Sequence, residues 1–199
     1  MKSETRVERQ RQIESAAYYV LEKKGFSGAS MLAIAKQAKA SNETLYRWYS
    51  DKTGLFTALV ERNAEDVKTM LAAQLDAEKQ PLDILAQLGP KLLEVLVGDR
   101  AIALNRAAAA DGTGVLGDAI AKSGRQSVAP LIAKTLERAK ANGDLHFHDS
   151  NDAVELFLSL LVGDLQIRRA IGQLPQPTYK DVEKRASTAL ARFQALMGA

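Results

Sequence analysis

The sequence predicts an all-α protein. Apolar residues recur every three or four positions along nearly all of the 199 residues, which is the spacing of amphipathic helices. Alanine and leucine are abundant and β-branched residues are sparse, a composition that favours helix. No segment shows the strict alternation of a half-buried strand. We expect an N-terminal domain over residues 1–50 and a larger helical domain over residues 51–199.

The first expected element is one long helix. Ile13, Ala16, Ala17, Val20 and Leu21 fall on one helical face. The Lys-Lys-Gly sequence that follows them is typical of a helix end, because glycine accepts the left-handed conformation that often closes a helix. The helix is therefore expected to stop near residue 25.

Two short helices are expected next. Ser30 should N-cap a helix that reaches about Ala38, and Ser41 should N-cap another from Asn42 to about Tyr49. A tight turn joins them, and a long helix stands on either side. Two short helices in this setting are typical of a helix-turn-helix.

The rest of the chain is also expected to be helical. Ser50 should N-cap a long helix whose apolar residues continue to Leu71. Pro90 should kink or break the helix after that. Further helices are expected over residues 101–110, 128–139, 149–171 and 182–193. The third of these is apolar nearly all round at its middle, which predicts burial on more than one side.

Positive charge is concentrated at the start of the chain. Residues 1–62 hold 11 Lys and Arg against 7 Asp and Glu, a net +4, whereas residues 63–199 hold 16 against 17, a net −1. This difference favours a module that faces a polyanion, although ordinary fluctuation of solvated charges explains it equally well.

Several classes of protein are excluded or disfavoured by composition. The chain has no cysteine, so disulfides and thiolate chemistry are excluded. No apolar run is long enough for a transmembrane helix, and the first residues lack the pattern of a signal peptide. We expect a cytoplasmic protein without membrane partners.

The second short helix has the residues that a DNA reader requires. Leu45 and the tyrosine four residues later should face the core. Asn42, Thr44, Arg47 and Trp48 would then point outward. Asparagine and arginine carry hydrogen-bonding groups that match the edges of adenine and guanine, and a threonine can contact a phosphate or a thymine methyl group.

The segment MLAIAKQAKASNETLYRWYSDKTGLFTALV resembles the DNA-binding signature of the TetR family of transcriptional regulators. The matching residues are Ile34, Ala35, Ala38, Ser41, Thr44, Leu45, Tyr46, Tyr49, Lys52 and Leu55. The resemblance implies an N-terminal three-helix DNA-binding domain of helix-turn-helix type, followed by a helical domain for ligand binding and dimerisation.

The resemblance also implies roles for individual residues. Thr44, Tyr46 and Lys52 would contact backbone phosphates, and Lys52 would do so in the first turn of a helix, where free N–H groups also suit an anion. Asn42, Arg47 and Trp48 would occupy positions that face the groove. The remaining expected DNA-binding residues are Ser30, Lys39 and Ser41.

Three residues depart from the family pattern. Lys39 stands where a turn glycine is common, so the turn should avoid a positive φ or be slightly strained, and its charge would lie beside the DNA. Ala40 replaces a larger valine. Glu43 replaces a common glycine; its carboxylate would repel phosphate or accept from a cytosine amino group, or would only stabilise the helix N-terminus.

The later helices resemble the AefR-like C-terminal type of the family, in stretches such as NDAVELFLSLLVGDL. This resemblance implies a homodimer formed by the last long helices, and the apolar helix over residues 152–168 suits that role. The expected dimerisation residues are Leu136, Leu156, Leu160 and Gly163. The glycine would let a second helix approach closely, or it is incidental.

A cavity for a small apolar or aromatic effector is also expected. Asn105 and Arg106 lie in an otherwise apolar helix, where polar groups often orient a ligand, although an exposed helix face explains them as well. The further candidates for this cavity are Asn63, Val67, Met70, Phe157 and Leu161.

Two other motifs carry little weight. Residues 112–117 match GxGxxG, but a dinucleotide site needs a strand before this motif and the preceding residues predict helix. His146 and His148 with Asp149 would make a poor metal site on a loop, and Asp149 or Ser150 is more simply an N-cap. We expect no metal and no cofactor.

These residues lead to one expectation about function. The protein should be a ligand-responsive regulator, most simply a repressor, that binds a palindromic double-stranded operator as a homodimer and leaves it when an effector binds. Two other classes stay open, a small helical enzyme and a helix-turn-helix module that binds proteins.

Overall fold

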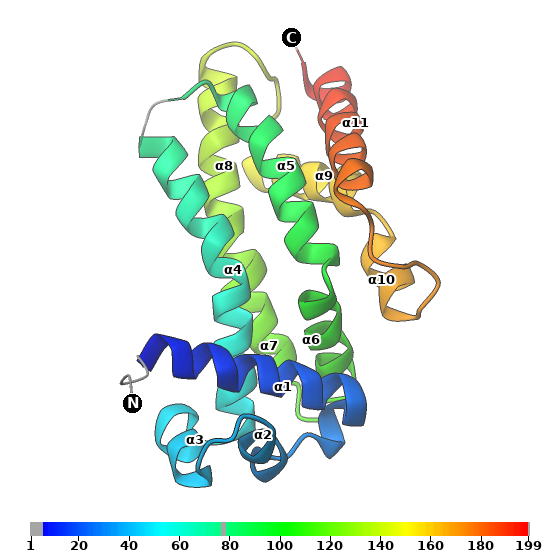
Figure 1. Ribbon diagram of the computed structural model, residues 1–199. Helices are drawn as coiled ribbons and strands as arrows, with labels where there is room; N and C mark the ends of the chain where they lie inside the picture. Colours follow the sequence, from blue (N-terminus) through cyan, green and yellow to red (C-terminus); the bar gives the residue numbers. More distant parts are fainter. Residues whose placement is uncertain (1–5, 77–78, 199) are drawn as a thin grey trace. The chain divides into compact units, whose positions relative to one another are not determined.

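The computed structural model describes residues 6–76 and 79–198, and these residues form helices without any strand (Figure 1). An isolated bridge pairs Leu145 with Gly198. The expected all-α class is confirmed. None of the helices in the described residues is both long enough and apolar enough to cross a membrane.

The chain forms two compact units. The first unit comprises Met1–Arg62 and Ala103–Ile120, and the second comprises Asn63–Ile102 and Ala121–Ala199. The division expected at residue 50 thus falls inside the first unit. The boundaries lie within or between consecutive helical segments rather than in loops, which is why no change of composition marks them in the sequence.

The first unit holds the predicted helix-turn-helix. Its elements are α1 (Arg6–Gly28), α2 (Met31–Gln37), α3 (Asn42–Tyr49), the start of α4 (Lys52–Asp76), the end of α6 (Asp99–Ala109) and α7 (Val115–Ile120). Gly25 interrupts α1 with a φ of 67°, at the position expected for a helix end. The core includes Ile13, Ile34 and Leu45 together with Leu104 and Leu116 from the later segment.

Serine and aspartate side chains set the starts of α2, α3 and α4. Ser30 Oγ accepts from the Ala33 N–H at 3.2 Å, and Ser41 Oγ accepts from the Thr44 N–H at 3.1 Å, as predicted. The prediction for Ser50 is wrong. Ser50 has a φ of 64° and closes α3, because its N–H donates to the Tyr46 carbonyl. Asp51 is the cap of α4, since its carboxylate accepts from the Gly54 N–H at 2.7 Å.

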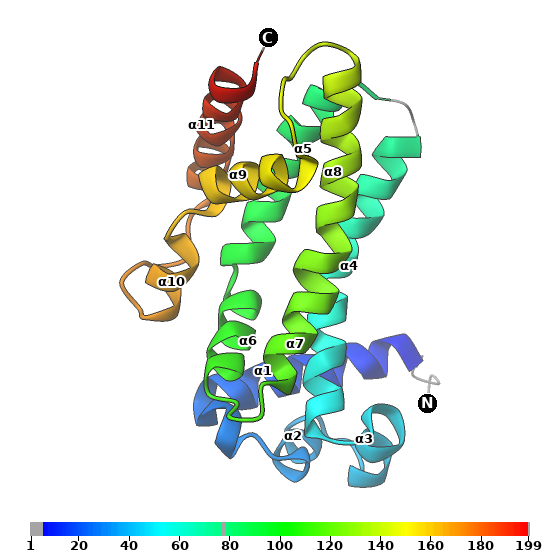
Figure 2. The ribbon, with the colours of Figure 1, turned by 180° about the vertical axis from the view of Figure 1, so that it is seen from behind.

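The second unit is a helical bundle (Figure 2). Besides the rest of α4 and the start of α6, its elements are α5 (Pro81–Val97), the π-helical turn η1 (Ala121–Arg125), α8 (Gln126–Ala141), α9 (Ser150–Val162), α10 (Leu165–Ala170) and α11 (Tyr179–Met197). Figure 2 shows α9 between α8 and α11, and α5 packs against both of these helices. Phe157 and Phe193 meet edge to face in the core, with ring centres 5.6 Å apart. Pro90 lies inside α5 without ending it.

The long helix predicted over residues 149–171 is wrong, because the chain breaks at Gly163. This glycine has a φ of 52°, α9 ends at Val162 and α10 begins at Leu165. The Leu161 carbonyl, which a continuous helix would pair with a backbone N–H, accepts instead from Arg185 Nε at 3.0 Å. A Cβ at Gly163 would lie 2.7 Å from Arg185 Nη2, so the same arginine leaves no room for a side chain.

Candidate nucleic-acid interface

Two side chains pack α3 against the core, and several of its other side chains are exposed to solvent. Leu45 is fully buried and Tyr49 is 8% exposed, so both face the core as their spacing predicts. Asn42 and Arg47 are exposed, and Tyr46 is 49% exposed. A short helix anchored on one side therefore offers an amide, a guanidinium and a phenol to solvent.

The start of α3 carries a pair of hydroxyls. Ser41 Oγ and Thr44 Oγ1 lie 2.8 Å apart, while Ser41 also caps the helix. Ser41 is exposed and Thr44 is half-buried. Hydroxyls beside a helix N-terminus suit a phosphate oxygen, which is the contact predicted for Thr44. Ser30, also among the expected DNA-binding residues, is exposed at the start of α2.

The turn between α2 and α3 adopts a positive φ despite its lysine. Lys39 has a φ of 50° and its side chain is exposed. Of the two outcomes expected for this turn, the strained one is therefore found. The Lys39 carbonyl accepts from Arg9 Nη2 at 2.6 Å, so α1 helps to hold the turn.

Lys52 lies where α4 begins and is anchored to the end of α1. Its Nζ donates to the Phe26 carbonyl at 2.8 Å and sits 4.0 Å from the centre of the Phe26 ring. A cation in the first turn lies near the positive end of the helix dipole, which is unfavourable. A bound anion would offset this electrostatic repulsion. Gly54 permits the close approach of α4 to α3, because a Cβ there would lie 2.0 Å from the Tyr49 carbonyl oxygen.

Trp48 is only partly available to a partner. The ring is half-buried against the core of the first unit, and the guanidinium of Arg6 lies over it at 5.6 Å from the ring centre. The sequence places Trp48 among the outward residues, and the structure puts it on the flank of α3 instead. Arg6 was not among the expected residues, because pairs between α1 and α3 leave no periodic signal in the sequence.

A polar cluster of Glu14, Arg62 and the Tyr49 hydroxyl lies on the core side of α3, and its role was not anticipated from the sequence. Glu14 is 6% exposed and pairs with Arg62 Nε at 2.8 Å, which joins α1 to α4 within the first unit. The Tyr49 hydroxyl is buried and has no hydrogen-bond partner among the described residues. Burial, and then the negative charge of Glu14, raise the pKa of Tyr49 to about 12. Glu14 could have been noticed because it lies three residues before Ala17, on the apolar face of α1.

The residues expected to line an effector cavity fall in both units. Asn105 and Arg106 belong to the first unit. The others belong to the second unit, where Val67, Phe157 and Leu161 are buried in the core. Asn63 and Met70 are half-buried there. The expectation that all seven line one cavity stays a prediction.

The expected dimerisation residues differ in their exposure. Leu136 is fully buried in the core of its own second unit, so its side chain has no surface left for another protomer. Leu156 and Leu160 are half-buried along α9. Gly163 is exposed, but it ends α9 rather than lying within a helix that a partner could approach.

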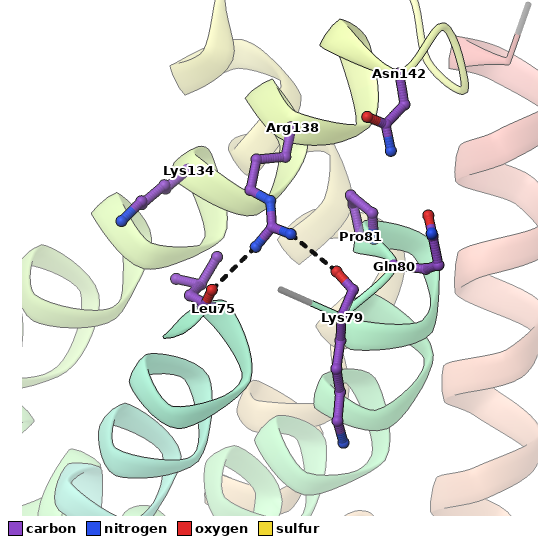
Figure 3. Close-up of a pocket in the computed structure, with 7 residues that line it drawn as sticks. All are labelled: Leu75, Lys79, Gln80, Pro81, Lys134, Arg138 and Asn142. Carbon is purple, nitrogen blue, oxygen red and sulfur yellow. Dashed lines mark hydrogen bonds between the residues drawn. The ribbon is translucent and has the colours of Figure 1, made fainter. Parts of the chain in front are cut away.

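An open pocket of about 400 Å³ lies on the second unit near the end of α8 (Figure 3). Its lining consists of Leu75, Lys79, Gln80, Pro81, Lys134, Arg138 and Asn142. Arg138 crosses the pocket and donates to the Leu75 carbonyl at 3.2 Å and the Lys79 carbonyl at 3.0 Å. The lining is largely polar and includes none of the residues expected for an effector, so this pocket does not match the apolar cavity.

The glycine-rich segment is a capped turn. Asp111 accepts from the N–H and hydroxyl of Thr113 and from the Leu116 N–H, at the start of α7. These bonds, the Leu116 one first, lower the pKa of Asp111. A carboxylate thus occupies the place that a pyrophosphate would need, and α6 precedes the motif instead of a strand. Asp149 is the cap of α9, and no cluster of metal-binding side chains occurs in the part of the chain described.

Two family models match the chain. The family described as "Bacterial regulatory proteins, tetR family" matches residues 13–59, and "AefR-like transcriptional repressor, C-terminal domain" matches residues 83–198, which is more than half of the chain. The chain belongs to the TetR family. The resemblance inferred from the α2–α3 signature and from the later helices is therefore confirmed. None of the curated proteins compared with the chain matches it.

Solved structures of TetR-family regulators share this fold. A regulator from Mesorhizobium loti MAFF303099 is 25% identical with a TM-score of 0.79, covering 98% of this chain and 100% of that one. A TetR regulator from Agrobacterium tumefaciens is 28% identical with a TM-score of 0.73, covering 96% and 95%. A protein described as flavonoid-responsive regulator FrrA is 27% identical with a TM-score of 0.69, covering 96% and 97%. This TetR-family chain is thus grouped with transcriptional regulators rather than with enzymes.

Proposed function

We propose that this protein is a ligand-responsive repressor that binds a palindromic operator as a homodimer in the cytoplasm. The observation that carries the proposal is the face of α3, where Asn42, Tyr46 and Arg47 are exposed while Leu45 and Tyr49 fix the helix to the core. Arginine and asparagine at such positions read base edges in the major groove. Lys39 and Lys52 supply positive charge at either end of this surface.

We propose a small apolar or aromatic effector. The similarity to a regulator described as flavonoid-responsive supports an aromatic ligand. Helix α4 begins just after α3 and continues into the second unit. A shift of α4 on effector binding would therefore move α3, the expected recognition helix. The effector would then favour a conformation in which the two copies of α3 in the dimer are no longer spaced to fit the two half-sites of one operator. This is a shift between pre-existing populations.

The experiment that tests the proposal is selection of binding sites from a random duplex library, followed by competition with candidate effectors. We expect a palindromic site to be enriched and its complex to dissociate when an aromatic effector is added. A chain that binds no duplex tightly at low salt would overturn the proposal.

Two variants separate the contacts that specify sequence from those that only position the protein. Arg47→Ala should relax the preference at its base pair, at a cost of about 1–3 kcal/mol for the selected site. Lys52→Ala should weaken binding to every sequence and reduce the salt dependence. Circular dichroism is needed as a control for Lys52→Ala, because the same ammonium bonds to the Phe26 carbonyl.

A further inference from the structure

The start of α1 is fastened to the DNA-reading elements at two points. The Arg6 guanidinium lies over the Trp48 ring on α3, 5.6 Å from its centre. One turn later, Arg9 donates to the Lys39 carbonyl in the turn that precedes α3. Figure 1 shows the first turn of α1 close to α3, although more than thirty residues separate them in the sequence. The position of Arg6 relative to the reader is therefore fixed by side-chain contacts.

Trp48 sits on a flank of α3 that already carries the expected phosphate contacts. Residues four apart share a side of a helix, so Trp48 lies on the same flank as Thr44. Glu43 and Arg47, also four apart, share the face directed away from the core. Trp48 lies about one helical turn along α3 from Thr44, and Arg6 stacks on it, so Arg6 is on the flank that carries the Ser41 and Thr44 hydroxyls.

The stacking contact with Trp48 leaves the N–H groups of Arg6 able to donate hydrogen bonds to another partner. A cation–π contact uses the face of the guanidinium and of the ring, whereas the N–H donors lie in the guanidinium plane and point outward from its edges. Arg6 is exposed, and its nearest acidic neighbour in α1, Glu8, is two residues away and so projects from another side of the helix. A planar cation held in place on an aromatic ring is suited to an oxygen anion.

We propose that Arg6 is a further phosphate-contacting residue and that Trp48 is the residue that positions it. The DNA-binding surface then extends from the helix-turn-helix onto the first turn of α1. This inference rests on the proposed operator binding and adds to it a residue outside the family signature. It also replaces the groove-facing role expected for Trp48, since the tryptophan acts through Arg6 rather than on a base.

The salt dependence of operator binding tests Arg6. Each phosphate contact contributes about 0.9 to the slope of log K against log salt, so Arg6→Gln should reduce the slope by about two in a dimer with two copies. Lys23→Gln is the matched control, because it removes the same charge from an exposed site on α1 about 25 Å from Arg6 at 1.5 Å per residue. Its slope should equal that of the wild type.

An unchanged slope for Arg6→Gln, with the wild type binding its operator normally, would overturn the assignment while the proposed function survives. A wild type that binds no duplex removes the proposed function, and the inference with it. Equal losses in Arg6→Gln and Lys23→Gln would also overturn it, because they would show a general effect of net charge rather than a local contact.

Trp48 is tested by its coupling to Arg6. Trp48→Leu should lower the salt slope as much as Arg6→Gln, and the double variant should lower it no further. Trp48→Phe keeps a ring and should keep most of the slope. Additive losses would contradict a positioning role.

Fluorescence provides a second readout that does not depend on DNA. Trp48 is the only tryptophan, so its emission reports the stacked cation directly. Arg6→Gln should shift this emission in the free protein and Lys23→Gln should not. Identical spectra for Arg6→Gln and the wild type would exclude the stacked arrangement, whatever the stability of the Trp48 variants.

Discussion

Lys39 adopts a left-handed backbone conformation, which costs a residue with a Cβ roughly 1 kcal/mol relative to glycine. We expect Lys39→Gly to be more stable than Lys39→Ala by about this amount, because both remove the charge and only glycine removes the strain. The Arg9 bond to the backbone carbonyl is available in both variants. Urea unfolding of the pair measures the difference, and an alanine variant as stable as the glycine variant would contradict the strain.

The hydroxyl of Tyr49 provides a prediction about pH. Its pKa is raised from 10.0 to about 12, first by burial, so the folded state prefers the neutral phenol. Stability from this group is complete below pH 10 and is lost as the pH rises from about 10 to 12, by up to about 1.4 kcal/mol per pH unit. Tyr49→Phe should abolish this loss.

The same variant tests whether the hydroxyl has a cost at neutral pH. A buried hydroxyl without a partner is unfavourable, so Tyr49→Phe should leave the free energy of unfolding unchanged or raise it by about 1 kcal/mol. Unfolding of both proteins across this pH range measures the two effects. A clear loss of stability in Tyr49→Phe at pH 7 would show that the hydroxyl is bonded in solution.

At the scale of whole elements, the break between α9 and α10 depends on one glycine. Gly163→Ala should destabilise the protein by about 1–3 kcal/mol, because alanine disfavours the positive φ and its Cβ would press on Arg185. Gly117→Ala is the matched control. Its Cβ has open space within α7, so it should be neutral or stabilising by up to about 1 kcal/mol. Thermal unfolding distinguishes the two, and equal effects would mean that the break is not set by Gly163.

Helical periodicity predicts elements well but not their ends. The caps at Ser30 and Ser41 were predictable because a serine stands just before an apolar helical pattern in each case. Ser50 and Asp51 are both capping residues in adjacent positions, and only the end of α3 decides between them. The break at Gly163 was not predictable for a related reason, since Arg185, which satisfies the freed carbonyl, lies 24 residues away.

In the candidate interface too, positions within one segment were predictable from the sequence, but contacts between distant segments were not. The signature places Asn42, Arg47 and Lys52 on the expected DNA-binding surface because all three fall within eleven consecutive residues, so their placement depends on local sequence. Arg6 and Arg62 reach α3 and α1 from distant segments, and such tertiary contacts have no period to reveal them. The burial of Leu136 was likewise hidden, because an apolar stripe does not say whether a helix packs inside its own chain or against another.

For the molecule as a whole, operator binding should depend on the spacing of two half-sites. A homodimer presents two copies of α3 at a fixed distance from each other. Both copies can bind when the two half-sites lie one helical turn of the DNA apart. Inserting about five base pairs, half a turn, should turn one half-site to the opposite side of the duplex and abolish tight binding. Gel-shift titration of the two duplexes measures this. Equal affinity for both would indicate that each protomer binds alone.

The chain passes between its two units three times, inside α4, inside α6 and from α7 into η1. Residues 1–62 alone would therefore encode an incomplete reader, because Leu104, Ala107 and Leu116 supply part of its core. A gene fragment cut after the helix-turn-helix could not be spliced onto another effector domain without losing this support. Exchange of whole domains between genes would therefore disrupt the first unit. New operator specificity is expected to arise by substitutions on the surface of α3 instead.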